Sequence, residues 1–324
     1  MMKKMRKGIS VIGVPMWLGQ TRFGANLGPD AIRAAGLVTR LKGLAYRVSD
    51  EGNIAVGTKA PYKRQDKTLK NLQPIVAASE KVAAKVSRTV AAGRFPLILG
   101  GDHSIAIGTL AGISRHYANL GVIWYDAHGD LNTPETTPSG NIHGMPLAAS
   151  MGLGHPALTG IGGYVGKVKA ENLVMIGIRD LDPGERLLIA ERKIRVYTAD
   201  DVSRLGIAQV IAETVDYLSA RCDGVHLSFD LDGIDPLEVP GVGTPVAGGI
   251  SYSDSLAALA LLHRSGIITS AELVEVNPLL DREDRTVSAA LALAGALFGE
   301  VADSEGICQP AAATPSVTAS AAKR

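Results

Sequence analysis

The stretch Phe95-Pro-Leu-Ile-Leu-Gly-Gly-Asp-His-Ser104 joins a continuous apolar run to a short polar segment. Residues 95–99 predict a buried strand, because a strand that is covered on both faces carries apolar side chains at successive positions. Residues 69–92 predict a helix before this strand, and residues 104–118 predict a helix after it. Strands that alternate with helices form parallel sheets. The polar side chains of this stretch therefore lie at the carboxyl end of a parallel strand.

The same alternation continues through the rest of the chain. Pro29 lies in the first turn of a helix that is predicted to begin at residue 28, a position that proline favours. Further strands are predicted over residues 9–14, 122–125, 173–178, 225–229 and 270–276, and further helices over residues 28–35, from 183 onward, and over 208–220, 253–264 and 286–298. This order predicts an α/β fold in which helices cover both faces of a mostly parallel sheet.

Composition sets limits on the organisation of the chain and on its partners. The chain has 324 residues, of which 46% are hydrophobic and 20% are charged, so a large core can form. We find no internal linker and expect a single domain over residues 1–302. Residues 303–324 are rich in Ala, Ser, Thr and Pro, which predicts a disordered tail. The net charge of +1 gives no reason to expect a nucleic acid or an anionic membrane as partner.

Targeting signals and cysteines bear on the compartment. No run of about 18 apolar residues predicts a membrane span, and the basic opening is not followed by the apolar stretch and cleavage site of a signal peptide. Two cysteines, Cys222 and Cys308, cannot form a disulfide framework. We therefore expect a reducing, cytoplasmic location.

Two further predicted strands end in acidic residues. Asp126-Ala-His-Gly-Asp130 follows one of them, and Phe229-Asp-Leu-Asp-Gly233 follows another. Residues two apart on an extended chain point to one side, and the carboxyl ends of parallel strands face one crevice. Six side chains would meet there: His103, Asp126, His128, Asp130, Asp230 and Asp232. Carboxylates this close repel one another by about 4 kcal/mol per pair at an effective dielectric of about 20. Bound cations or protons must therefore hold the cluster together, which predicts a metal site.

The donor set narrows the choice of metal. Carboxylates and imidazoles without a thiolate favour Mn²⁺ or Mg²⁺, although Co²⁺, Ni²⁺ or Zn²⁺ could compete on affinity alone. Six side chains are too many for one catalytic ion that must keep an open position. Two divalent ions with bridging aspartates would use all six and would balance the four aspartate charges. A water between two such ions loses a proton near neutral pH and becomes a hydroxide nucleophile.

These segments resemble the motifs of the ureohydrolase family. Residues 100–104, 126–130, 228–236 (Ser-Phe-Asp-Leu-Asp-Gly-Ile-Asp-Pro) and 275–278 (Glu-Val-Asn-Pro) match its signatures in family order. Thr133-Pro-Glu-Thr-Thr-Pro-Ser-Gly-Asn-Ile-His-Gly-Met-Pro146 is similar to arginases in particular. The resemblance extends from Ile9 to Phe298. It implies a three-layer α/β/α domain with a parallel sheet, and a homo-oligomer that is a trimer or a hexamer.

The resemblance also implies a cofactor, a substrate and a reaction. One Mn²⁺ would be held by His103, Asp126, Asp130 and Asp230, and a second by Asp126, His128, Asp230 and Asp232, with Asp126 and Asp230 bridging. The substrate would be L-arginine, hydrolysed to L-ornithine and urea by a metal-bridging hydroxide that attacks the guanidinium carbon.

Three residues receive catalytic roles from the resemblance. Asp130 would hydrogen-bond the hydroxide and then carry its proton, as general acid–base catalysis requires. His143 would be the proton shuttle to the leaving amine. Glu275 would hold the planar guanidinium by paired charge-assisted hydrogen bonds.

The amino-acid end of the substrate separates arginases from their relatives. By the resemblance, Asn132, Ser139 and Asn141 lie in the loop that meets the α-carboxylate. Asp182 and Asp180 would lie near the α-amino group, and Thr244 beside the substrate and the metal. Agmatine lacks the carboxylate and would leave the loop groups unpaired, which costs on the order of 10⁴-fold in discrimination.

Three alternatives stay open at this stage. An agmatinase or another amidinohydrolase of the same fold would differ only in substrate. A single-zinc deacetylase of related architecture would also use strand-end ligands, although His103 and the acids of residues 126–130 count against it. A catalytically silent scaffold would not need the intact ligand set.

Two details of the sequence fall outside the motifs. Of the other histidines, His226 shares a strand face with Asp230 and is a candidate for a supporting role, whereas His116, His155 and His263 are interpreted as structural. Around residues 17–24 the chain departs from arginases, which commonly have an acid where Trp17 stands.

Overall fold

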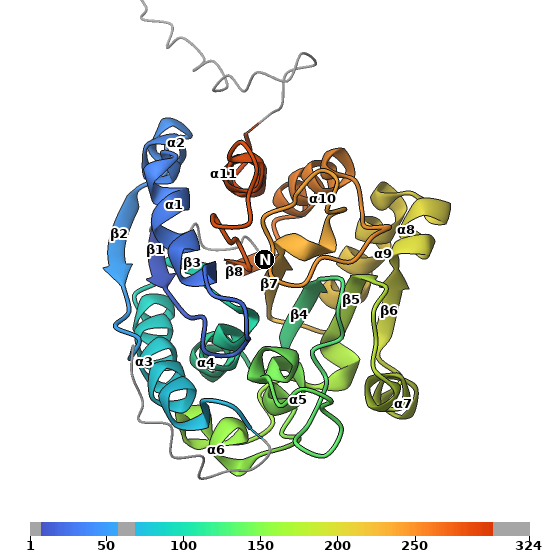
Figure 1. The fold of residues 1–324 in the computed structure, drawn as a ribbon. Helices are drawn as coiled ribbons and strands as arrows, with labels where there is room; N and C mark the ends of the chain where they lie inside the picture. Colours follow the sequence, from blue (N-terminus) through green and yellow to red (C-terminus); the bar gives the residue numbers. More distant parts are fainter. Residues whose placement is uncertain (1–7, 58–68, 301–324) are drawn as a thin grey trace, which may run out of the picture.

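A computed structural model describes residues 8–57 and 69–300 (Figure 1). The strands that it describes form one parallel eight-stranded sheet in the order β2-β1-β3-β8-β7-β4-β5-β6. Their bounds are β1 Ile9–Val14, β2 Val48–Asn53, β3 Phe95–Gly100, β4 Leu120–Tyr125, β5 Leu173–Ile178, β6 Arg195–Thr198, β7 Gly224–Asp230 and β8 Ile268–Val274. The predicted α/β fold with a parallel sheet is confirmed.

Two edge strands, β2 and β6, were not predicted. β2 has the sequence Val-Ser-Asp-Glu-Gly-Asn, and its last four residues are exposed. Short or charged strands are common at sheet edges, where they discourage pairing with another chain. β6 has only four residues and borders β5. Neither sequence carries the continuous apolar run by which the central strands were recognised.

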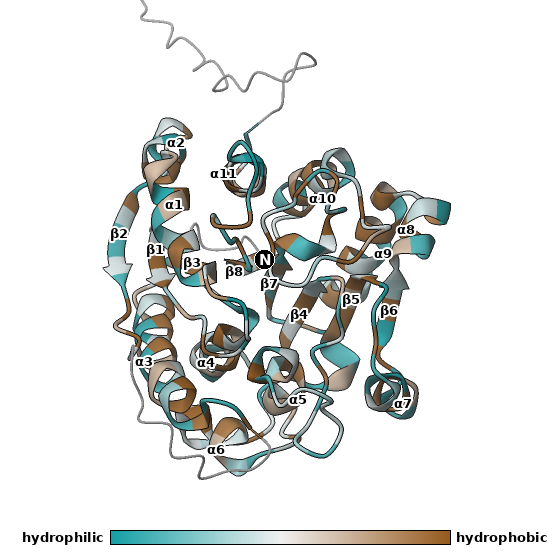
Figure 2. Ribbon diagram, in the orientation of Figure 1, coloured by the Kyte–Doolittle hydropathy of each residue, from teal (hydrophilic) through white to brown (hydrophobic). Residues whose placement is uncertain are grey.

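Helices cover both faces of the sheet, which gives three layers (Figure 1). The helices are α1 Gly28–Ala34, α2 Leu37–Gly43, α3 Leu72–Ala91, α4 Ala106–Ile113, α5 Pro146–Ser150, α6 Pro156–Thr159, α7 Pro183–Arg192, α8 Ala199–Leu205, α9 Ile207–Ser219, α10 Tyr252–Ser265 and α11 Arg285–Leu297. Side chains of α1, α2 and α8–α11 pack on one face of the sheet, and those of α3–α5 pack on the other. The central strands between them are mostly apolar (Figure 2).

Several boundaries differ from the prediction. The helix predicted over residues 104–118 is shorter: α4 spans Ala106–Ile113, with a single 3₁₀ turn on each side. The strand predicted over residues 270–276 is β8, Ile268–Val274, so Glu275 follows the strand. Among the described residues, no helix is both long and apolar enough to cross a membrane. The predicted tail at 303–324 lies outside the described residues, so this boundary and the single domain over 1–302 stay predictions.

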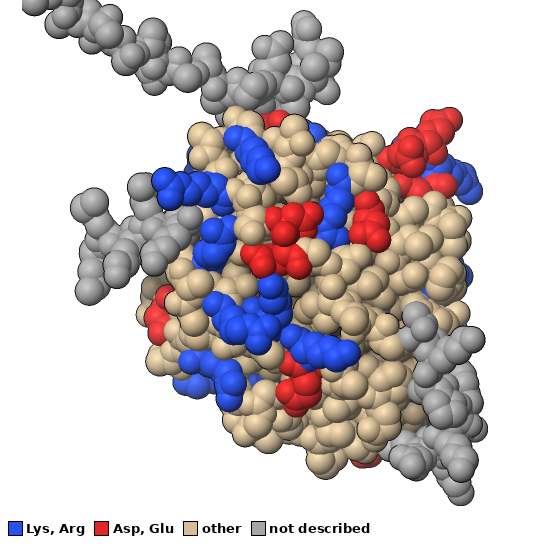
Figure 3. Space-filling view, turned by 90° about the vertical axis from the view of Figure 1, so that its left-hand side faces the viewer, with Lys and Arg blue, Asp and Glu red and all other residues tan. Residues whose placement is uncertain are grey.

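The outer face beside β2 and α3 carries both basic and acidic side chains (Figure 3). Ion pairs connect them, for example Lys85 Nζ to Glu51 Oε2 at 2.7 Å and Arg33 Nε to Asp50 Oδ2 at 3.0 Å. Exposed pairs of this kind each contribute at most about 1 kcal/mol to stability. The charges on this face are therefore distributed in pairs.

The register of the central strands brings the predicted site together. Leu99 of β3 lies opposite Leu273 of β8, Leu273 lies opposite Phe229 of β7, and Phe229 lies opposite Tyr125 of β4. The four strands therefore reach their carboxyl ends at a common level. The next residue after both Phe229 and Tyr125 is an aspartate. Two carboxylates thus begin from neighbouring positions at this edge of the sheet.

Candidate metal centre

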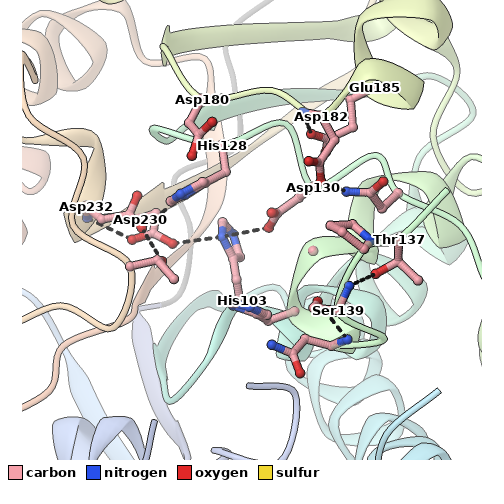
Figure 4. Close-up of a pocket in the computed structure, with 16 residues that line it drawn as sticks. His103, His128, Asp130, Thr137, Ser139, Asp180, Asp182, Glu185, Asp230 and Asp232 are labelled. Atoms are coloured by element: carbon pink, nitrogen blue, oxygen red, sulfur yellow. Dashed lines mark hydrogen bonds and ion pairs between the residues drawn. The ribbon is translucent and has the colours of Figure 1, made fainter. Parts of the chain in front are cut away.

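Two groups of acidic residues and histidines converge at this edge of the sheet (Figure 4). One consists of His103, Asp126 and Asp230, and the other of Asp126, His128 and Asp232. Within each group the possible ligand atoms all lie within 4.8 Å of one another. Asp126 belongs to both groups, so the two sites share a carboxylate.

The first group is almost completely buried. Nδ1 of His103 lies 3.0 Å from Oδ2 of Asp126 and 3.0 Å from Oδ2 of Asp230. Oδ2 of Asp130 is 3.3 Å from the same nitrogen. The His103 ring stacks on the indole of Trp124, with centroids 4.0 Å apart and planes 2° from parallel. The stacking fixes the plane in which His103 presents its nitrogen.

The second group lies beside the first and is partly open. Nδ1 of His128 lies 3.3 Å from Oδ1 of Asp126 and 3.2 Å from Oδ2 of Asp232. The hydroxyl of Thr244 donates a hydrogen bond of 3.0 Å to the same Asp232 oxygen. The side chain of His128 is 23% exposed, whereas both aspartates are buried. Access to the site is therefore from the His128 side.

Capped turns in the loops that follow the strands orient these side chains. The Asp102 carboxylate accepts hydrogen bonds from the Ser104 and Gly19 amides, at 3.0 and 2.8 Å, and so caps the 3₁₀ turn that carries His103. The Asp230 carboxylate caps the next turn by accepting from the Asp232 amide at 2.8 Å. Such caps satisfy the free amides at the start of a helical turn. The backbone of each loop is thereby fixed before any ligand binds.

The charges of the cluster are unbalanced without a cation. Burial and the neighbouring carboxylates raise the pKa of Asp130 and of Asp230 well above the usual range. Burial opposes protonation of His103, but Asp126 and Asp230 outweigh it and raise the pKa of this imidazole. Nδ1 of His103 and Oδ2 of Asp126 are buried and have no hydrogen-bond partner. Oxygen and imidazole donors with unsatisfied lone pairs fit a pair of hard divalent ions.

A cavity of about 290 Å³ opens onto the cluster. We call the six predicted ligands the floor: His103, Asp126, His128, Asp130, Asp230 and Asp232. We call the polar side chains around the opening the rim: Asn132, Thr137, Ser139, Asn141, Asp180, Asp182 and Glu185. Figure 4 shows the floor histidines facing the acids of β7, with Asp182 and Glu185 above them at the start of α7. His143 and Thr244 also line the cavity.

Comparison with known proteins assigns this arrangement to a family. A sequence model described as "Arginase family" matches residues 7–299. The chain belongs to the arginase family. An arginase of Bacillus caldovelox is 59% identical over 91% of this chain and 99% of its own length. A solved structure of Bacillus caldovelox arginase, 58% identical and with the same coverage, superimposes with a TM-score of 0.89.

A more distant structure gives a contrast within the same fold. A hypothetical agmatinase from Burkholderia thailandensis is 27% identical, with a TM-score of 0.70, over 90% of this chain and 84% of that one. The chain is therefore much more similar to the Bacillus caldovelox arginase structure than to this one. The ureohydrolase resemblance read from the motifs is confirmed.

The structure brings most of the predicted substrate residues to the cavity. Besides His143 and the floor residues other than Asp126, the lining includes Asn132, Ser139, Asn141, Asp180, Asp182 and Thr244. Glu275 does not line it. The Glu275 carboxylate is buried, accepts from the His103 amide at 2.9 Å and lies 3.6 Å from Nδ1 of His143. It also accepts from Gln20 Nε2 at 2.7 Å, and its backbone has a positive φ of 66°.

Sequence reasoning missed several residues of this arginase-family site. Glu185 accepts from the Leu131 amide and, as part of a capping box at the start of α7, from the Asp182 amide. An acid three residues after Asp182 and before a helix is a readable signal for this box. Gln20 carries no such signal, because its partner is 255 positions away along the chain.

The remaining sequence features have ordinary contacts. His155 caps α6 by accepting from the Ala157 amide, and His116 lies 2.9 Å from the Ser87 hydroxyl. In residues 17–24, where the sequence departs from the arginase pattern, the ring of Trp17 packs edge-to-face on that of Phe23, with centroids 5.2 Å apart. The chain thus has an aromatic pair in this segment.

Proposed function

We propose that this chain is an arginase, which hydrolyses L-arginine to L-ornithine and urea at a two-manganese centre. The observation that carries the proposal is the pair of His/Asp groups that share Asp126 at the carboxyl ends of β3, β4 and β7. Membership of the arginase family, with 59% identity to a protein of that name, supports the same reaction.

We assign the floor residues to two ions. His103, Asp126, Asp130 and Asp230 would hold one, and Asp126, His128, Asp230 and Asp232 the other. The short distances from His103 and His128 to these carboxylates support the division. Manganese is proposed because the donors are mainly carboxylate oxygens. When bound, two divalent ions supply Lewis-acid activation of water near neutral pH.

Asp130 and His143 would handle the protons of the reaction. Asp130 lines the cavity, where its carboxylate would accept a proton and pass it on. Burial lowers the pKa of His143, but the carboxylate of Glu275 outweighs this and raises it, so His143 is available as an acid. A leaving amine needs a proton when the C–N bond breaks. His143 is the cavity residue that we assign to supply it.

Glu275 is proposed to orient the guanidinium, and it would do so from behind the cavity lining. The carboxylate lies near His143, and it lies close to Gly243, which precedes Thr244. His143 and Thr244 both line the cavity, so Glu275 lies close to its lining. Its hydrogen bonds from Gln20 and from the His103 amide fix the carboxylate in place.

The rim, with Thr244, is proposed to recognise the amino-acid end of the substrate. Asn132, Ser139 and Asn141 would meet the α-carboxylate, and Asp180 and Asp182 the α-amino group. The amide of Asn132 donates to Asp182 at 2.8 Å, so the two parts of the rim are joined. A substrate without the carboxylate would leave polar groups of the rim unpaired.

Urea release by the metal-stripped protein tests the proposal. We expect no urea from L-arginine before Mn²⁺ is added and restored turnover afterwards. Agmatine should be slower by on the order of 10⁴-fold in kcat/KM. Mg²⁺, Co²⁺, Ni²⁺ and Zn²⁺ are assayed in parallel to test the choice of metal. A preference for agmatine would replace arginase by agmatinase, and a protein that binds one ion per chain would contradict the two-metal site.

We also propose that the protein is a trimer or a hexamer and that it is located in the cytoplasm. Large apolar side chains at the surface support self-association: Leu237 is 83% exposed, Leu279 60% and Phe23 52%. Light scattering on the purified protein would measure the subunit number, and fractionation of cells would test the location.

A further inference from the structure

A line of polar side chains runs from the floor into the interior of the sheet. Nε2 of His103, the ring nitrogen on the side away from the floor carboxylates, lies 2.7 Å from the hydroxyl of Ser228 on β7. That hydroxyl donates a hydrogen bond of 2.7 Å to Oε1 of Glu272 on the neighbouring strand β8. Both Ser228 and Glu272 have no exposed surface. A carboxylate at the centre of a parallel sheet therefore contacts the site through one hydroxyl.

The same oxygen of Glu272 has a second buried neighbour, His226. Nε2 of His226 lies 3.3 Å from Oε1 of Glu272, and Nδ1 of His226 lies 3.0 Å from the hydroxyl of Ser270. Isolated carboxylates are rarely kept in apolar interiors, because burying an unpaired charge is costly.

The donors and acceptors among these groups determine the direction of the hydrogen bonds between them. Ser228 is the donor in its hydrogen bond to Oε1 of Glu272, so the Ser228 proton is directed to Glu272. The Ser228 oxygen then accepts a hydrogen bond from Nε2–H of His103. With its proton on Nε2, His103 has a lone pair on Nδ1, the atom that faces Asp126 and Asp230. A ring nitrogen must be in this state to bind a metal, and outer hydrogen bonds commonly set it.

We propose that Glu272 is a positioning residue for the metal centre, which acts through Ser228 to hold His103 in the tautomer that binds the first ion. This inference rests on the proposed function, in which His103 is a ligand. It assigns a role to a side chain that touches neither the cavity nor a predicted ligand. His226 lies beside this carboxylate, with its Nε2 3.3 Å from Oε1.

A purely structural role would give different results. If Glu272 and His226 only joined β7 to β8, their removal would lower the stability of the fold and affect both ions alike. A positioning role predicts a loss at the His103 site with the His128 site unchanged. Ser270 provides a matched control, because it is on β8, is completely buried and contacts His226 without contacting Ser228.

Calorimetric titration of Mn²⁺ into metal-stripped full-length protein tests the proposal. Glu272→Leu removes the acceptor and should weaken one of the two binding steps by about 10- to 100-fold, the range for lost partners of metal ligands. The other step should change by less than about twofold. Glu272→Gln retains a carbonyl acceptor and should recover part of the affinity. Ser270→Ala should match the wild type in both steps.

A double-mutant cycle separates a relay from independent effects. Ser228→Ala breaks the line next to His103, so adding Glu272→Leu to it should cause less than about a twofold further loss, because coupled residues are not additive. Full additivity would overturn the proposal, as would equal weakening of both binding steps or unchanged affinity in Glu272→Leu.

Proton NMR of the Co²⁺-loaded protein decides the case if Glu272→Leu does not fold. The shifted ring N–H signal of His103 should move in Glu272→Gln, because an amide is a weaker acceptor than a carboxylate. A signal at the wild-type position would reject the relay. If the wild type itself binds no metal or releases no urea, the proposed function fails first, and the two failures are thus distinguished.

Discussion

The floor and the rim of the cavity both consist of polar residues but differ in how their polar groups are satisfied. In the floor, buried atoms such as His103 Nδ1 and Asp126 Oδ2 have no hydrogen-bond partner. In the rim, Asn132 donates to Asp182 at 2.8 Å and Ser139 accepts from the Asn141 amide at 3.1 Å. The floor is thus electrostatically incomplete without cations, whereas the rim is held by its own contacts.

The difference assigns separate tasks to the two regions. Buried ligand atoms that have no hydrogen-bond partner gain the most favourable interaction energy from a bound ion. We therefore expect floor substitutions to abolish metal binding and turnover together. Satisfied polar groups near the opening exchange one hydrogen bond for another when a substrate binds, so rim substitutions should change which substrate is preferred. Substitutions in the two regions test this division.

The largest effect is expected for Asp126→Asn in the floor. Asp126 is the carboxylate that both groups share, so its neutralisation should weaken both ions. Urea release should fall by about 10⁴-fold or more, because metal activation of water supplies several kcal/mol and each 1.4 kcal/mol is about tenfold. In addition, Mn²⁺ should no longer raise the melting temperature, which ligand binding otherwise does. Asp200→Asn, an exposed acid on α8, is the control.

This floor was predictable from the sequence, and the reason is geometric. Three apolar runs marked parallel strands, and an Asp or His at the end of each had to face the same edge. The supporting contacts were not predictable in the same way. The hydrogen bond from Gln20 to Glu275 joins residues 255 positions apart, and only the folded loops bring them together.

The edge strands and the site roles show the same limit. β2 was missed because its residues Ser49 to Asn53 are mostly polar and its contacts are on one side only. The role predicted for Glu275 stays a prediction, and its buried contacts with His143 and Gln20 could not be read from the sequence. The pattern of apolar residues along the sequence thus predicts strands that are buried on both faces. Contacts between loops depend on the whole fold and cannot be predicted in this way.

The second effect is expected at His143, between the floor and the rim. His143→Ala should lower kcat by about 10²- to 10³-fold, within the range for a lost general acid, and leave Mn²⁺ affinity unchanged. His155→Ala, which removes a helix cap away from the cavity, should retain wild-type kcat. Steady-state kinetics with saturating Mn²⁺ measure both. A parallel loss of metal affinity in His143→Ala would place this residue with the floor.

The contact between His143 and Glu275 predicts how stability and turnover depend on pH. Burial opposes the protonation of His143, but the Glu275 carboxylate raises its pKa above the usual histidine value of 6.5. The ion pair therefore stabilises the fold fully below the unfolded pKa, and this contribution is lost as the pH rises through the folded pKa. The alkaline decline of kcat should move to lower pH in Glu275→Gln.

A smaller effect is expected for Glu185→Gln, which loosens the rim. The Glu185 carboxylate accepts from the amides of Leu131 and Asp182, at 2.9 and 2.8 Å. An amide side chain can satisfy only one of them, so we expect a loss of about 1–3 kcal/mol in the free energy of unfolding. KM for arginine should rise and Mn²⁺ affinity should stay the same. Glu191→Gln, exposed on the same helix, is the control for urea denaturation and kinetics.

The smallest effect is expected for Ser139→Ala at the outer part of the rim. Its hydroxyl accepts from the Asn141 amide at 3.1 Å and is exposed, so its removal leaves no buried group unpaired. A lost hydrogen bond of about 0.5–1.5 kcal/mol corresponds to a rise in KM for arginine of about 2- to 10-fold.

Agmatine serves as the internal control for Ser139→Ala, because it has no carboxylate for this hydroxyl to meet. Its KM should therefore stay at the wild-type value while that for arginine rises. Because the floor is untouched, kcat and Mn²⁺ affinity should also be unchanged. A fall in kcat, or equal changes for the two substrates, would show that the rim and the floor are not independent, since a contact to the α-carboxylate alone can affect only the substrate that carries it.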